Sequence, residues 1–170
     1  MAGTPAAAYV RNQATAAALV NVVLNPLIEW VLNGEKGFQP FWGSAGVVFN
    51  VALTSIILSV LVALFAARGV RHELAAGRIA TGDKAVRAPR LPSRLPGRAG
   101  WLGLLLGIGA AAVVATAFWL LHLVGVSGLS IGGLLILKAV YCGVLAFVVA
   151  RWTILRQLVA ADGSPSNYTP

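Results

Sequence analysis

The chain has 170 residues, of which 58% are hydrophobic and only 11% are charged. A soluble domain carries about a quarter charged residues, so this composition excludes an ordinary soluble fold and indicates an integral membrane protein. The net charge is +8, and the single Cys142 excludes an internal disulfide and leaves no metal-ligand spacing. Four apolar stretches predict an all-α bundle of four transmembrane helices, a single membrane domain over residues 1–170.

The first predicted span, residues 12–32, carries Asn21, Asn25 and Glu29 within its apolar part. Their four-residue spacing places them on one helical face, within about 80° of arc. Amides and a carboxylate inside a span are costly unless they meet partners or water, so another helix should cover this face. We expect the segment to stay in the mature protein, because the first ten residues lack the basic region of a cleavable signal peptide.

The second predicted span, residues 44–67, is strongly apolar apart from Asn50 and a few hydroxyl residues. Ser55 and Ser59 begin a ridge of small residues at four-residue spacing. Such a ridge lets a neighbouring helix approach closely. We therefore predict that this face packs against another helix, either within the chain or in a second copy.

The third and fourth predicted spans cover residues 101–124 and 131–152 and are joined by a tight turn. The third span has its own small-residue ridge and carries His122 near its far end. The fourth span has Lys138 about two turns inside its start. The ridge of the third span consists of Gly103, Gly107, Ala111 and Ala115.

The connection over residues 68–100 is strongly basic, with eight Lys and Arg residues against Glu73 and Asp83. The simplest interpretation is a topology signal that also touches anionic lipid headgroups, rather than a nucleic-acid site. Its first part could extend the preceding helix into water. The residues assigned to headgroup contact are Arg87, Arg90, Arg94 and Arg98.

The distribution of basic residues predicts the topology. Eleven of the thirteen Lys and Arg residues lie near the N-terminus, in the long connection or near the C-terminus. By the positive-inside rule these parts are cytoplasmic, so the fold is two helical hairpins with both termini inside. Composition favours a bacterial plasma membrane, and residues 160–170 have the polar composition of a flexible tail.

Polar groups on all four spans fall in the same outer layer. With a rise of about 1.5 Å per residue, Glu29 and His122 lie on the order of 6 Å inside the outer ends of their helices. Asn25, Asn50 and Lys138 lie roughly 10–12 Å deep. We predict an outward-facing polar vestibule with Asn21 at its floor, in which Glu29 pairs with Lys138 and His122 can share the carboxylate.

Each of these residues also has a purely structural interpretation. Asn residues often join helices, with a contribution of about 1 kcal/mol or less. Glu29 and His122 are close enough to the interface to be solvated there, and Lys138 could form an ion pair without any transport role. The polar residues could equally face a second copy of the protein.

Three function classes follow from this reading. The first is transport or translocation of a polar, ionic or lipid-linked ligand through the vestibule, in a homo-oligomer because four helices form a thin bundle. The second is an accessory or scaffold subunit of a larger membrane complex. The third, a lipid-modifying enzyme, is the least supported, because paired carboxylates and nucleophile–base pairs are missing. We expect no catalytic residue, cofactor or metal, and His72 and His122 fall on opposite sides of the membrane.

Overall fold

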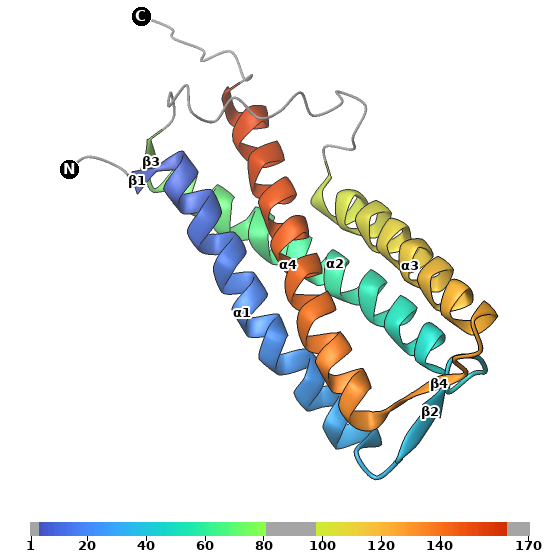
Figure 1. Cartoon of the computed structure of the whole chain (residues 1–170). Coiled ribbons are helices and arrows are strands. Elements are labelled where there is room, and N and C mark those ends of the chain that lie inside the picture. The colour runs from blue at the N-terminus through green and yellow to red at the C-terminus, as the bar shows by residue number, and fades with distance from the viewer. Residues whose placement is uncertain (1–3, 81–97, 163–170) are drawn as a thin grey trace, which may run out of the picture.

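The computed structural model describes residues 4–80 and 98–162. Within these ranges the chain forms four long helices and four short strands (Figure 1). In chain order they are β1 (Thr4–Pro5), α1 (Ala6–Asn33), β2 (Phe38–Pro40), α2 (Val47–Ala75), β3 (Ile79–Ala80), α3 (Ala99–Leu123), β4 (Gly128–Ser130) and α4 (Ile131–Asp162). All four helices are long and apolar enough to cross a membrane, which indicates a multi-pass membrane protein.

The helices are longer than the apolar segments that predicted them. α1 begins at Ala6 rather than near residue 12, α2 continues to Ala75 and α4 continues to Asp162. The predicted spans stopped where apolar composition stopped, but a helix continues wherever its backbone bonds and packing allow. The added turns pack on each other through a separate apolar cluster, made by Ala6, Val10, Val70, Ile79, Ile154 and Leu158.

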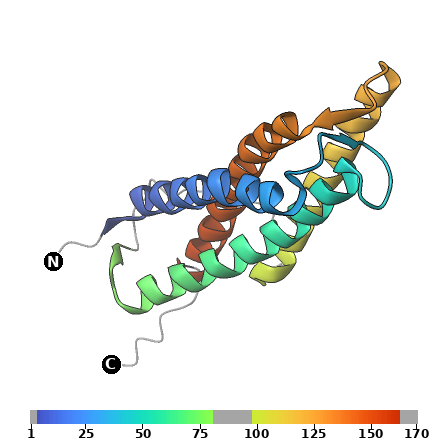
Figure 2. The same ribbon diagram turned by 90° about the horizontal axis from the view of Figure 1, so that it is seen from below.

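The packed pairs differ from the predicted hairpins. α1 packs along α4, α2 packs along α3, and α4 also packs along α2, which places the helices in the spatial order α1–α4–α2–α3 (Figures 1 and 2). α1 and α2 follow each other in the chain but barely touch. A short connection brings two helix ends together without making the helices lie side by side, so the two helices joined by each short turn pack little on each other.

The short strands hold the connections at the two ends of the bundle. β2 and β4 pair antiparallel, with Gln39 opposite Leu129, so the α1–α2 and α3–α4 turns lie at the same end. β1 and β3 pair in parallel and join the start of α1 to the segment after α2. The prediction contained no strands, because segments of two or three residues carry no periodicity.

The small-residue ridges pack within the chain. A Cβ atom on Gly103 would lie 2.6 Å from the backbone oxygen of Ser59, and one on Gly107 would lie 2.8 Å from Cα of Ile56. Ser55 and Ser59 on α2 are fully buried. Ala115, farther along the same ridge as Ala111, packs against the core cluster around Val51 and Val114. Close approach of the α2 and α3 backbones explains why these positions are small.

Candidate functional site

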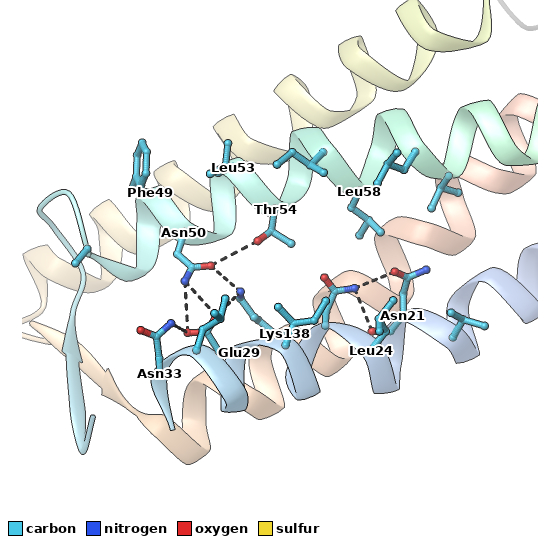
Figure 3. A pocket seen from close by; sticks show the side chains of 18 of the residues that line it. Asn21, Leu24, Glu29, Asn33, Phe49, Asn50, Leu53, Thr54, Leu58 and Lys138 are labelled. Atoms are coloured by element: carbon cyan, nitrogen blue, oxygen red, sulfur yellow. Dashed lines mark hydrogen bonds and ion pairs between the residues drawn. The ribbon is translucent and has the colours of Figure 1, made fainter. Parts of the chain in front are cut away.

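A groove runs between α1 and α2, because these two helices barely touch and α4 packs against both. It has a volume of about 620 Å³ and is lined by both helices, with Lys138 reaching in from α4 (Figure 3). A space of this size is typical of small-molecule and lipid sites. The groove contains the polar residues that the sequence placed in the vestibule, except His122.

Glu29 and Lys138 form an ion pair inside the groove. Nζ of Lys138 donates to Oε2 of Glu29 at 2.6 Å, and the two side chains are only 5% and 1% exposed, respectively. The pair joins α1 to α4 within one chain. An unpaired buried charge costs several kcal/mol of stability, so each of the two groups requires the other.

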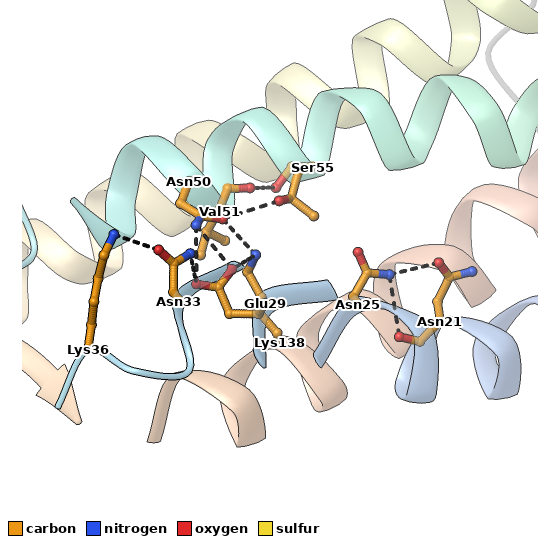
Figure 4. A network of polar contacts seen from close by, with 10 residues as sticks. Asn21, Asn25, Glu29, Asn33, Lys36, Asn50, Val51, Ser55 and Lys138 are labelled. Atoms are coloured by element: carbon orange, nitrogen blue, oxygen red, sulfur yellow. Dashed lines mark hydrogen bonds and ion pairs between the residues drawn. The ribbon is translucent and has the colours of Figure 1, made fainter. Parts of the chain in front are cut away.

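Asn50 of α2 completes the contact between three helices (Figure 4). Its Oδ1 accepts from Nζ of Lys138 at 2.6 Å, and its Nδ2 donates to Oε2 of Glu29 at 3.1 Å. An amide can serve both charges at once because it carries a donor and an acceptor. Asn50 therefore lies where α1, α2 and α4 meet, and it is the contact that links α1 to α2 across the groove.

Sequence reasoning missed Asn33 and Lys36, which continue the network toward the turn after α1. Nδ2 of Asn33 donates to Oε1 of Glu29 at 2.8 Å, and Nζ of Lys36 donates to Oδ1 of Asn33 at 2.6 Å. The signal was present, because Asn33 is the next residue in the four-residue series of Asn21, Asn25 and Glu29.

Thr54 lies one turn after Asn50 and lines the same groove. Its Oγ1 is 3.5 Å from Oδ1 of Asn50, a long contact at the limit of a hydrogen bond. Ser55, which the sequence assigned to packing, also makes polar contacts. Its Oγ donates to the carbonyl of Val51 at 2.6 Å and lies 2.7 Å from the hydroxyl of Tyr141.

Asn21 and Asn25 form a second group of polar side chains farther along the groove. Nδ2 of Asn25 donates to Oδ1 of Asn21 at 2.9 Å, and Nδ2 of Asn21 donates to the carbonyl of Ala17 at 2.8 Å. These bonds stay within α1, unlike those of Glu29. The two amides therefore present polar atoms to the groove without joining helices.

The remaining lining of the groove is apolar. α1 contributes Val20, Leu24, Ile28 and Leu32, and α2 contributes Phe49, Leu53, Ile57, Leu58, Leu61, Val62 and Phe65. Most of these side chains are exposed, including Leu24 and Leu53 at 46% and 47%. The groove is thus polar near one end and apolar along its length.

His122 does not belong to the site, which corrects the expectation that it shares the carboxylate of Glu29. Its side chain is exposed at the end of α3, and its ring lies edge-on to Trp42 with 6.2 Å between ring centroids. α3 packs along α2 and not along α1, so His122 lies at the same end of the bundle as Glu29 but not beside it.

The predicted headgroup contacts Arg87, Arg90 and Arg94 lie outside the described residues. Arg98 is described and lies immediately before α3, with its side chain exposed. The predicted tail is helical over residues 160–162, and residues 163–170 lie outside the described residues.

The chain matches no protein-family model, no curated protein and no solved structure. Its function must therefore be argued from the groove and its residues.

Proposed function

We propose that this chain binds an amphipathic, lipid-linked or otherwise polar-headed ligand in the groove between α1 and α2 and moves its polar head across the membrane. The observation that carries the proposal is the buried Glu29–Lys138–Asn50 contact at one end of an otherwise apolar groove. A ligand enters from the bilayer, because the groove lies along the outside of the bundle between two candidate spans. Its chain lies on the apolar walls and its head meets the polar end.

The charges at the site favour a neutral or zwitterionic head. Glu29 and Lys138 compensate each other, so a strongly charged head would leave one buried charge uncompensated. The amides of Asn33 and Asn50 already bind the carboxylate, and hydroxyl or amide groups of a ligand can replace them as partners. When ligand groups replace these amides on the carboxylate of Glu29, Asn50 no longer links α1 to α2. α1 could then move away from α2 and return after the ligand leaves.

The exposed side of α1 supports an oligomer as the working form. Among the described helices α1 packs along α4 alone, and its large apolar residues Leu19, Val23 and Val31, which lie outside the groove, are 63–69% exposed. A second copy can cover this face and leave the groove open to lipid. An alternative supported by the same observation is an accessory subunit whose α1 binds a larger membrane partner.

Native mass spectrometry from mild detergent tests the proposal with two matched variants. Leu24→Trp fills the groove, and Leu105→Trp places the same bulk on α3 at a position that is 47% exposed and outside this groove. The wild type and Leu105→Trp should retain a lipid-sized mass that Leu24→Trp loses. A labelled analogue of that lipid should then cross vesicle membranes faster with wild type than with Leu24→Trp.

Two results would contradict this function. Equal lipid retention by both tryptophan variants would place the bound lipid outside the groove. A lone chain without lipid, or a chain held to an unrelated protein through α1, would favour the accessory subunit.

A further inference from the structure

A second recess lies at the opposite end of α2 from Asn50, between the last turns of α2 and the start of α3. Its volume is about 650 Å³, and three arginines line it, Arg68 and Arg71 from α2 and Arg98 from the start of α3. These arginines are separated in sequence but meet here because α2 and α3 pack along each other. No Asp or Glu among the described residues lines this recess.

The arginines of this recess have unused hydrogen-bonding capacity. Nε of Arg71 donates to Oε1 of Gln157 at 3.1 Å, which positions its guanidinium without neutralising it. The side chains of Arg68 and Arg98 are exposed, and their guanidinium groups make no hydrogen bond or ion pair to the other described residues. The nearest acidic residue on α2, Glu73, is bound by Arg78 at 2.7 Å. Within residues 4–80 and 98–162, no carboxylate neutralises these three positive charges, which can therefore bind an anion.

The beginning of α3 adds backbone donors to the same recess. Ala99 and Gly100 line it, and no side chain caps the helix at Arg98. The first turn of α3 contains no acidic residue. The first amide groups of a helix lack partners within the helix and favour a negative charge, which adds to the attraction of the arginines.

Apolar residues on the membrane side of the recess decide what kind of anion fits. Leu61, Leu64 and Phe65 line it one to two turns before Arg68 and are 47%, 48% and 72% exposed, respectively. A free phosphate would not use this surface. A phospholipid would place its phosphate among the arginines and its acyl chain along these three side chains.

We propose that this recess is a binding site for an anionic phospholipid, with the phosphate held by Arg68, Arg71 and Arg98 at the start of α3. The bound lipid links α2 to α3 at the end of the bundle away from Glu29. The proposal does not depend on the function of the α1–α2 groove, because the two sites share only Leu61 and Phe65.

Lipid titration of the full chain in detergent tests this site, with phosphatidylglycerol and phosphatidylcholine as probes and melting temperature and native mass spectrometry as readouts. Arg68→Gln combined with Arg98→Gln removes two charges from the recess. Arg11→Gln combined with Arg151→Gln removes two exposed charges from α1 and α4 as the matched control. Arg71 is left in place because it bonds Gln157 on α4.

Phosphatidylglycerol should raise the melting temperature of the wild type and the control more than phosphatidylcholine does. Each arginine near an anionic lipid surface raises the binding affinity by a factor of about five. The recess variant lacks two arginines and should therefore bind phosphatidylglycerol roughly 30-fold more weakly. Equal binding by the recess variant and the control would overturn the proposal. So would an equal response to phosphatidylcholine, or an equal stabilisation by inorganic phosphate, which would make the recess a simple anion site.

Discussion

Nζ of Lys138 lies 2.6 Å from Oε2 of Glu29, across a sequence separation of 109 residues. This contact joins α1 to α4, which also pack along each other. The amide of Asn50 joins α2 to both charges. The three residues of the candidate site therefore lie where α1, α2 and α4 come together.

Breaking this ion pair from one side should be worse than removing both charges. Lys138→Ala strands a buried carboxylate and should cost about 3 kcal/mol or more, whereas adding Glu29→Gln should recover part of that loss. Thermal or denaturant unfolding of the two single variants and the double variant in detergent measures the coupling. Arg151→Ala, at an exposed position on the same helix as Lys138, serves as the control with a small effect. Strict additivity of the two changes would mean that the pair contributes nothing to stability.

Two asparagines in the same groove should differ in importance. Asn50→Ala removes contacts to both members of the ion pair and should cost about 2 kcal/mol, because hydrogen bonds to charged groups are the stronger ones. Asn25→Ala removes bonds made only within α1 and should cost about 0.6 kcal/mol or less. Unfolding free energies of the two variants in the same detergent give the comparison. Equal losses would mean that the link across the groove has no special role.

Gly107 and Gly109 lie on opposite faces of α3, and substitution of each by leucine should have opposite effects on stability. Gly107→Leu would push the α2 backbone away, since even a Cβ atom there lies 2.8 Å from Cα of Ile56, and should cost about 1–3 kcal/mol or more. A Cβ atom on Gly109 has no neighbouring atom within 4 Å, and Gly109→Leu replaces a poor helix former, so the stability should be unchanged or higher. Melting temperatures of the two variants provide the measurement. An unchanged melting temperature for Gly107→Leu would contradict the close packing of α3 on α2.

The predicted orientation in the membrane can be measured by cysteine labelling in a Cys142→Ala background. Lys36→Cys and Ala76→Cys place exposed thiols at opposite ends of the bundle. If both termini are cytoplasmic, a membrane-impermeant maleimide should label Lys36→Cys in intact cells and label Ala76→Cys only after permeabilisation. The reverse pattern would invert the topology and place the arginine recess outside.

The helices and the polar residues of the site were predictable from the sequence because their signals are local. A stretch of about 20 apolar residues predicts a span whatever surrounds it. The depths of Glu29, Asn50 and Lys138 followed from counting residues along each helix, and the structure brings these three together. Gly103 and Gly107 likewise marked a packing face in advance.

Which helices lie side by side in the bundle could be seen only in the tertiary structure. Counting along a helix gives a position along its axis but not the neighbouring helices, so His122 was expected near Glu29 although it lies on α3 against Trp42. The same limit explains why the sequence did not show that α1 packs along α4 and α2 along α3. The groove exists because of that order, and the arginine recess exists because α2 and α3 pack together. The membrane class and the four helices could be predicted from the sequence, because both depend on local composition and length. The two sites depend on contacts between helices distant in sequence, which no local pattern encodes.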